Sequence, residues 1–244
     1  MEIHHHKRHV NYERKWKNYL VEFLMIFLAV TAGFLAENIR ESIMERSRAK
    51  EMALTLYDDI KKDTAALKVS IDFSHNKISC IDTAIKILHS DPATWNDTVL
   101  YKNLYMVTRV YSFERTEGTY DQIKNSGSLR YFEPELVGLL NTYDVYAKKA
   151  KERDEIDNKY ISDHSSPMTV ELINMEVVLD IINDVPITHE LYFKKKDKDS
   201  RDKLINVAIY AKRNRDRSLI EYNKLMKTAM DILAELKKDY KIKN

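Results

Sequence analysis

The chain contains only four Gly and four Pro in 244 residues, and this scarcity restricts the folds open to it. Sheets joined by tight turns need Gly or Pro at many positions, whereas helix interiors exclude both residues. The stretch 37–90 contains neither of them. Hydrophobic residues make up 44% of the chain and charged residues 32%, which is enough for a core beneath a polar surface. We therefore expect an all-α fold of long helices.

The longest apolar run covers residues 19–36, YLVEFLMIFLAVTAGFLA. As a helix it spans roughly 27 Å, against about 30 Å for the hydrocarbon core of a bilayer. Glu22 interrupts the run, and the uncharged remainder, residues 23–36, spans only about 21 Å. Glu22 would thus lie near the bilayer edge, where a carboxylate can reach the headgroups. Because Trp16 and Tyr19 suit an interfacial aromatic belt, we predict a single transmembrane helix over 19–36.

Three other interpretations of this run compete with a transmembrane anchor. A cleaved signal peptide would need small residues at its cleavage site, and Thr31-Ala32-Gly33 is only a passable match. A buried core helix would suit the short uncharged run. An interfacial helix needs a polar face, which residues 23–34 lack. The transmembrane anchor is favoured, with the signal peptide and the core helix as alternatives.

The residues that flank the run predict its orientation. Basic residues end directly before it, and a slightly smaller group follows it: Lys7, Arg8, Arg14, Lys15 and Lys17 before, and Arg40, Arg46, Arg48 and Lys50 after. The positive-inside rule then places residues 1–18 in the cytoplasm as a basic tail, and the C-terminal part on the other side of the membrane. His4, His5, His6 and His9 invite a metal site, but the tail offers no thiol or carboxylate cluster beside them. We read this tail as headgroup-facing and predict no metal.

Residues 37–90 show apolar side chains at an average spacing of 3.5, the pattern of a coiled coil or a long bundle helix. This interface seam comprises Ile39, Ile43, Ala53, Tyr57, Ile60, Leu67, Ile71, Ile78, Ile81, Ile85 and Leu88. Arg46, Lys50, Thr64 and Ser74 fall within it and weaken it. We expect a stalk helix that continues the anchor without a break, packs from about Ala53 onward, and associates with a second copy of the chain through this seam.

Residues 91–244 are predicted to form an elongated helical bundle on that stalk. Asp91-Pro92 ends the stalk, and Asn96 or Asp97 can cap a helix that extends to about residue 112. Further helices are expected before Gly127, after Glu133-Pro134 and over 170–182, with a loop over 184–200. The last helix, about 200–240, has its own seam and should pack on the stalk.

No catalytic or cofactor signature emerges from the sequence, so we expect no enzyme, no cofactor and no small-molecule substrate. The 40 basic and 38 acidic residues are nearly balanced, which gives nucleic-acid binding little support. Asp58, Asp59 and Asp63 are interpreted as a solvated charged face, and the lone Cys80 as a small core residue. Glu22 is the sharpest candidate, because an ionisable group inside a membrane helix is a functional hypothesis by default.

Three segments carry a resemblance to a known family: WKNYLVEFLMIFLAVTAGFLAENIRES, LTLYDDIKKDTAAL and TYDQIKNSGSLRYFEPELVGLLNTYD. Together they resemble an uncharacterised family of bacterial single-pass membrane proteins. That family shares a membrane helix near the N-terminus with a Glu close to its start, here Glu22, and a polar exit, here Glu37-Asn38. The resemblance implies the bacterial inner membrane and a periplasmic C-terminal domain, and it transfers no active-site residue.

The expected role is therefore a membrane-anchored scaffold or interaction module, whose partners are the bilayer and either a second copy of the chain or another membrane protein complex. One alternative is an accessory subunit of an ion-driven or transport complex that uses Glu22. Another is a helical sensor domain that signals through the stalk.

Overall fold

The computed structural model describes residues 12–189, 193 and 196–242, with side chains from Trp16 onward, and this part of the chain is helical without any named strand. The chain divides into two compact units, residues 1–51 and 52–244. The expected all-α fold is confirmed. The histidine tract and Lys7 and Arg8 lie outside the described residues, and so do the side chains of Arg14 and Lys15.

The first unit consists of the start of helix α1 (Tyr12–His89), which is uninterrupted as the sequence predicts. Its apolar run is long and apolar enough to cross a membrane, judged by length and composition, and none of it is buried. It is the one such helix in the described part of the chain. Beyond the run, Arg40 donates to the Glu37 carboxylate within one helical turn.

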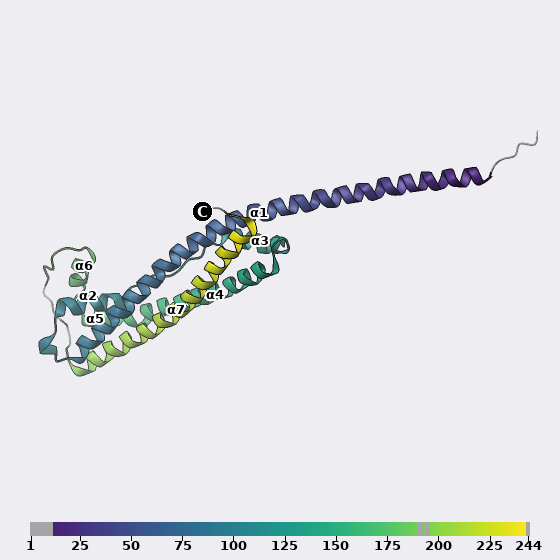
Figure 1. Ribbon diagram of the computed structural model, residues 1–244. Helices are drawn as coiled ribbons and strands as arrows, with labels where there is room; N and C mark the ends of the chain where they lie inside the picture. The colour runs from purple at the N-terminus through teal and green to yellow at the C-terminus, as the bar shows by residue number, and fades with distance from the viewer. Residues whose placement is uncertain (1–11, 190–192, 194–195, 243–244) are drawn as a thin grey trace, which may run out of the picture. The chain divides into compact units, whose positions relative to one another are not determined.

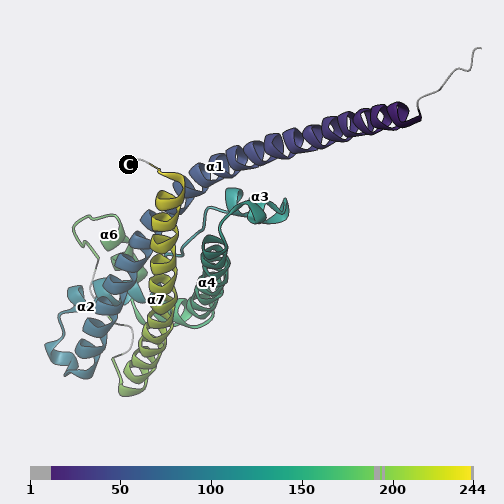
Figure 2. The same cartoon turned by 45° about the vertical axis from the view of Figure 1, so that its right-hand side comes forward.

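The second unit is a bundle of three long helices: α1 from residue 52, α4 (Pro134–Tyr160) and α7 (Lys198–Tyr240). They run side by side in both views (Figures 1 and 2). The shorter α2 (Asp97–Thr108), α5 (Ser166–Leu172) and α6 (Met175–Ile182) gather at one end of this unit, and α3 (Gly118–Asn125) lies at the other (Figure 1). Short helical turns complete it at Pro92–Thr94, Ser128–Tyr131 and Ile161–Ser165.

The residues that begin and end these helices follow the chemistry of helix caps. The Asn96 side chain accepts from the Val99 amide at the start of α2 at 3.1 Å, and Asp197 accepts from the Ser200 amide at the start of α7 at 3.0 Å. Pro134 opens α4, and Gly127 takes the left-handed conformation, with φ of 70°, after α3. The signals at Asn96, Gly127 and Pro134 are local, and the sequence predicts them; the Asp197 cap was not predicted.

Two helices differ from expectation. Helix α2 ends at Thr108 rather than near residue 112, because the following backbone bonds to buried side chains instead of continuing the helix. The apolar patch 170–182 is two helices, α5 and α6, separated at Ile173, whose backbone is extended. Ile173 forms an isolated β-bridge with Phe193, which draws it away from helical geometry.

Candidate functional site

Most buried residues of α1 in the second unit follow a heptad alternation of three and four: Ala53, Leu56, Ile60, Asp63, Leu67, Ser70, Ser74, Lys77, Ile81, Ala84 and Leu88. Tyr57 and Asp59 are buried beside this row. The predicted seam coincides with this row at every second position. The remaining seam residues lie outside the row: Tyr57 is buried, but Ile71, Ile78 and Ile85 are only half-buried. The other half of the row runs through Leu56, Asp63, Ser70, Lys77 and Ala84, and the sequence reading missed it because three of these five residues are polar.

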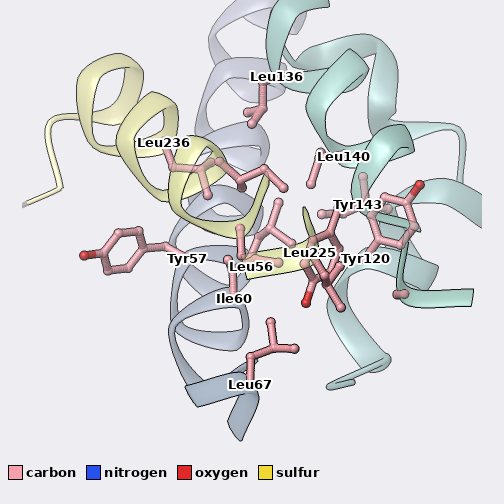
Figure 3. Close-up of a cluster of buried hydrophobic side chains, with 14 of the residues drawn as sticks. Leu56, Tyr57, Ile60, Leu67, Tyr120, Leu136, Leu140, Tyr143, Leu225 and Leu236 are labelled. Atoms are coloured by element: carbon pink, nitrogen blue, oxygen red, sulfur yellow. The ribbon is translucent and has the colours of Figure 1, made fainter. Parts of the chain in front are cut away.

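Two apolar clusters fill the ends of the bundle. The first apolar cluster includes Leu56 and Leu67 of α1, Leu140 of α4 and Leu225 of α7. Their side chains converge between the three helices, together with Tyr143 and Tyr120 (Figure 3). The second apolar cluster includes Ile81 and Leu88 of α1, Leu104 of α2, Val177 of α6 and Ala208 of α7.

Between the two clusters the core is polar. We call this region the polar layer; it consists of Ser70, Ser74, Lys77, Asp154, Asp157, Asn214, Arg215 and Ser218. All eight residues are at most 5% exposed. They come from α1, α4 and α7, so each of the three long helices contributes polar residues at the same level of the bundle.

Arg215 is the centre of the polar layer. Its Nε and Nη2 atoms donate to Asp157 Oδ2 at 3.1 and 2.5 Å, and Nη1 donates to the carbonyl of Tyr111 at 3.3 Å. Although burial opposes it, the neighbouring carboxylates of Asp157 and Asp154 and the Tyr222 hydroxyl raise the pKa of Arg215. The guanidinium therefore stays charged and links α7 to α4.

Asp154 holds the next position on α4. It accepts from the Tyr222 hydroxyl at 2.5 and 2.6 Å and from the Phe113 amide at 3.1 Å. Burial raises the pKa of the Asp154 carboxyl, and these hydrogen bonds together with Arg215 oppose that shift. Burial and the same carboxylate raise the pKa of Tyr222, so its hydroxyl remains a donor.

Lys77 brings a second cation into the layer from α1. Its Nζ donates to the carbonyl of Arg109 at 2.8 Å and lies 3.8 Å from Asp157 Oδ2. Burial lowers the pKa of Lys77 to about 8, against the attraction of Asp157, and the nearby Arg215 lowers it further. Two carboxylates thus face two cations. This balance is what a low-dielectric interior requires, since an unpaired buried charge is strongly unfavourable.

The layer exists beside a non-helical segment, residues 109–117, which we call the crossing segment. Apart from the Arg109 amide and the Glu117 carbonyl, which bond to the ends of α2 and α3, its buried backbone groups need partners outside a helix. Lys77 and Arg215 donate to the carbonyls of Arg109 and Tyr111, and Asp154 accepts from the amide of Phe113. Further along, Asp63 of α1 accepts from the Thr116 amide at 2.8 Å and from the Tyr143 hydroxyl at 2.5 Å. The cationic side chains donate to backbone carbonyls of the segment, and the carboxylates accept from its backbone amides.

This placement corrects the interpretation of Asp59 and Asp63 as a solvated face. Asp63 is 1% exposed, and Asp59 accepts from the Thr119 hydroxyl at 2.5 Å, while Asp58 is exposed. Cys80, expected in the core, is partly exposed. The polar layer itself was missed. The only available signal was the recurrence of Asp63, Ser70 and Lys77 every seven residues, which a search for apolar periodicity discards.

A pocket of about 700 Å³ lies beside the crossing segment. Its walls are residues 112–115 and 117 of that segment and the α4 face that includes Lys148, Lys151 and Asp154. Arg115, Lys124 and Lys148 all donate to the Asp144 carboxylate, at 2.8 to 3.0 Å. Although burial opposes it, these bonds hold the pKa of Asp144 well below its ordinary value. The pocket is therefore bordered by a fixed cluster of charges.

The predicted membrane residues Trp16, Tyr19 and Glu22 are exposed on the surface of α1 in the first unit. The first two residues of the predicted seam, Ile39 and Ile43, are exposed there as well. Among the described residues, no group of three His, Cys, Asp or Glu side chains is arranged to hold a metal ion.

Comparison with known proteins adds no assignment: no family model, curated protein or solved structure matches the chain.

Proposed function

We propose that this protein is a single-pass, membrane-anchored helical module whose bundle binds another protein. The observation that carries the anchor is the exposure of the apolar run in α1. Its large side chains, from Leu20 to Leu35, are 45–69% exposed. Monomeric soluble proteins rarely expose a continuous apolar surface of this size, whereas the hydrocarbon core of a bilayer would cover it.

The same observation weighs on the alternatives. A core helix would be buried, and none of this run is. A cleavage at Thr31-Ala32-Gly33 would cut within the unbroken α1. The basic flank before the run favours a cytoplasmic N-terminus, and the family resemblance favours a bacterial inner membrane with the bundle in the periplasm. Both remain parts of the proposal.

Self-association needs a different surface from the one the seam suggested. From Ala53 to Leu88, the fully buried row of α1 is covered by α4, α7 and the shorter helices of the same chain. Ile39 and Ile43 are the seam residues left exposed. A second copy would therefore have to pack on these residues or elsewhere, and the mass of the detergent-solubilised protein would reveal it.

A second candidate, the sensor domain, is favoured by the pocket. Its wall, the crossing segment, is hydrogen-bonded to α1 through Asp63 and Lys77, and α1 carries the predicted anchor. A ligand in the pocket would thus act on the helix that enters the membrane. A ligand-dependent unfolding temperature would test this role. The accessory-subunit role of Glu22 gains no added support from the exposed position of that residue.

The anchor is tested by membrane extraction at alkaline pH. Wild-type protein should stay with the membranes. Leu28→Arg, in the middle of the run, should reduce insertion, because an Arg at a helix centre costs about 3 kcal/mol in a bilayer. Ile43→Arg is the matched control, since Ile43 and Leu28 are almost equally exposed, 63% and 62%. Release of the wild type, or equal damage by both variants, would overturn the anchor.

A further inference from the structure

Helix α6 is apolar on both of its sides. Val177 and Val178 pack into the second apolar cluster, and Asp180 fixes the helix by accepting from the Thr188 amide at 3.0 Å and pairing with His189 at 2.9 Å. On the opposite side Met175, Leu179, Ile182 and Val185 are 42–55% exposed. We call these four residues the α6 face.

The α6 face is a continuous row. Met175, Leu179 and Ile182 follow the helical spacing of i, i+4 and i+7. Val185 extends the row past the helix end. Asp184, with φ of 52°, takes the left-handed conformation, and the Val185 amide donates to the Asp180 carbonyl at 3.1 Å. This closing turn has the bonds of a Schellman motif, which folds Val185 back toward the helix.

The segment that carries the α6 face contains acidic residues but no Lys or Arg. Residues 160–193 form the longest stretch of the chain without Lys or Arg, although these make up 40 of the 244 residues. The stretch carries six acidic residues: Asp163, Glu171, Glu176, Asp180, Asp184 and Glu190. Of these, Glu176 and Asp184 border the α6 face and are exposed.

An apolar row bordered by carboxylates favours one kind of binding partner. An anionic lipid surface would be repelled by the carboxylates. A second copy docked symmetrically would bring the same acidic residues against each other. A cationic helix with one apolar side satisfies both features, because its apolar residues pack on the row and its Lys or Arg residues meet Glu176 and Asp184.

We propose that the α6 face is the docking surface for a basic amphipathic helix of a partner protein. The inference rests on the proposed interaction role of the bundle and is independent of the anchor. Helix α6 spans about 12 Å, so it would contact roughly two turns of the partner helix. The outward position of α6 at its end of the bundle leaves this surface accessible (Figures 1 and 2).

The probe is an 18-residue peptide of Leu and Lys with all Leu on one helical side, titrated against the full chain in nanodiscs of neutral phosphatidylcholine, with empty nanodiscs as the blank. Two comparison peptides replace every Lys by Glu or scramble the Leu positions. We expect the Leu–Lys peptide to bind the protein at least about tenfold more tightly than either comparison peptide, a difference of roughly 1.4 kcal/mol.

Two variants locate the binding. The double variant Leu179→Ser/Ile182→Ser should weaken it at least about tenfold. The double variant Glu176→Gln/Asp184→Asn should weaken it severalfold and reduce its salt dependence. Ile220→Ser, at an equally exposed apolar residue of α7, should change nothing. Circular dichroism must show unchanged helix content for each variant.

Equal binding of the Glu peptide, full binding by Leu179→Ser/Ile182→Ser, or dimerisation through the α6 face would each overturn the inference. A chain that fails to enter nanodiscs overturns the anchor instead, and the same titration can then be completed in buffer. The two failures are therefore distinguishable.

Discussion

The polar layer and the first apolar cluster lie in the same bundle and bury their side chains equally well, yet they stabilise it in different ways. In the cluster, Leu56, Leu140 and Leu225 contribute in proportion to the apolar area removed from water. In the layer, Lys77, Asp157 and Arg215 have no such term and depend on mutual pairing. The cluster holds the helices, and Phe113 of the crossing segment, by apolar contact. The layer links α7 to α4 through Arg215 and Asp157, and its side chains also bond to the backbone of the crossing segment. A helical core can therefore include a non-helical segment if ionisable side chains complete the backbone hydrogen bonds of that segment.

The strongest test of this contrast removes the central cation. Arg215→Met keeps much of the side-chain volume but leaves Asp157 and Asp154 without their guanidinium partner, and breaking a buried ion pair costs about 3–5 kcal/mol. Arg217→Met, at an exposed position of the same helix, should have little effect. The measurement is urea unfolding of the full chain in mild detergent, followed by circular dichroism. A stable Arg215→Met protein would show that the layer does not depend on pairing.

Two isoleucines of α1, three residues apart, test which side of the helix faces the core. Ile81 is fully buried in the second apolar cluster, and Ile78 belongs to the predicted seam but is only half-buried. Ile81→Ala should cost about 2–5 kcal/mol of unfolding free energy, because it leaves a cavity in a packed core. Ile78→Ala should cost markedly less, in the same urea experiment. Equal losses of unfolding free energy would mean that Ile78 contributes to the core as much as Ile81, as the predicted seam requires.

The helix caps and the buried row of α1 differ in how well the sequence predicts them. The all-α class, the apolar run and the helix ends at Asn96, Gly127 and Pro134 follow from local signals, and the sequence predicts them. It does not predict the Asp197 cap or the division of residues 166–182 into α5 and α6. The phase of the buried row was not predicted either. Choosing apolar residues selects Ile71 and Ile78 over Ser70 and Lys77, because apolar periodicity assumes that a core is apolar throughout.

The crossing segment was missed for a related reason. Val110 and Tyr111 continue the apolar pattern of α2, so the sequence predicts a helix that extends to about residue 112. What ends α2 at Thr108 is the supply of backbone partners by Lys77, Asp154 and Arg215. These residues lie between 32 and 104 positions away in sequence from the backbone groups they bond. A local pattern carries no information about partners at that distance.

The smallest expected effect is a pH dependence that belongs to Lys77 alone. Its pKa falls from 10.5 to about 8 in the folded protein, so between these values the unfolded chain holds a proton that the folded chain has released. Stability must then rise with pH in this window, because the cost of burying a charged amine disappears as Lys77 loses its proton.

The clean measurement is the difference in unfolding free energy between wild type and Lys77→Met. Other titrating groups, including Tyr143 and Tyr222 with their raised pKa values, occur in both proteins and cancel to first order. The unfolding free energy of the wild type, relative to that of Lys77→Met, should increase by about 2 kcal/mol between pH 7 and pH 9.5. A difference that stays flat would mean that Lys77 is as well solvated as an exposed lysine. The layer would then be wet, and its contrast with the apolar clusters would be one of hydration rather than of pairing.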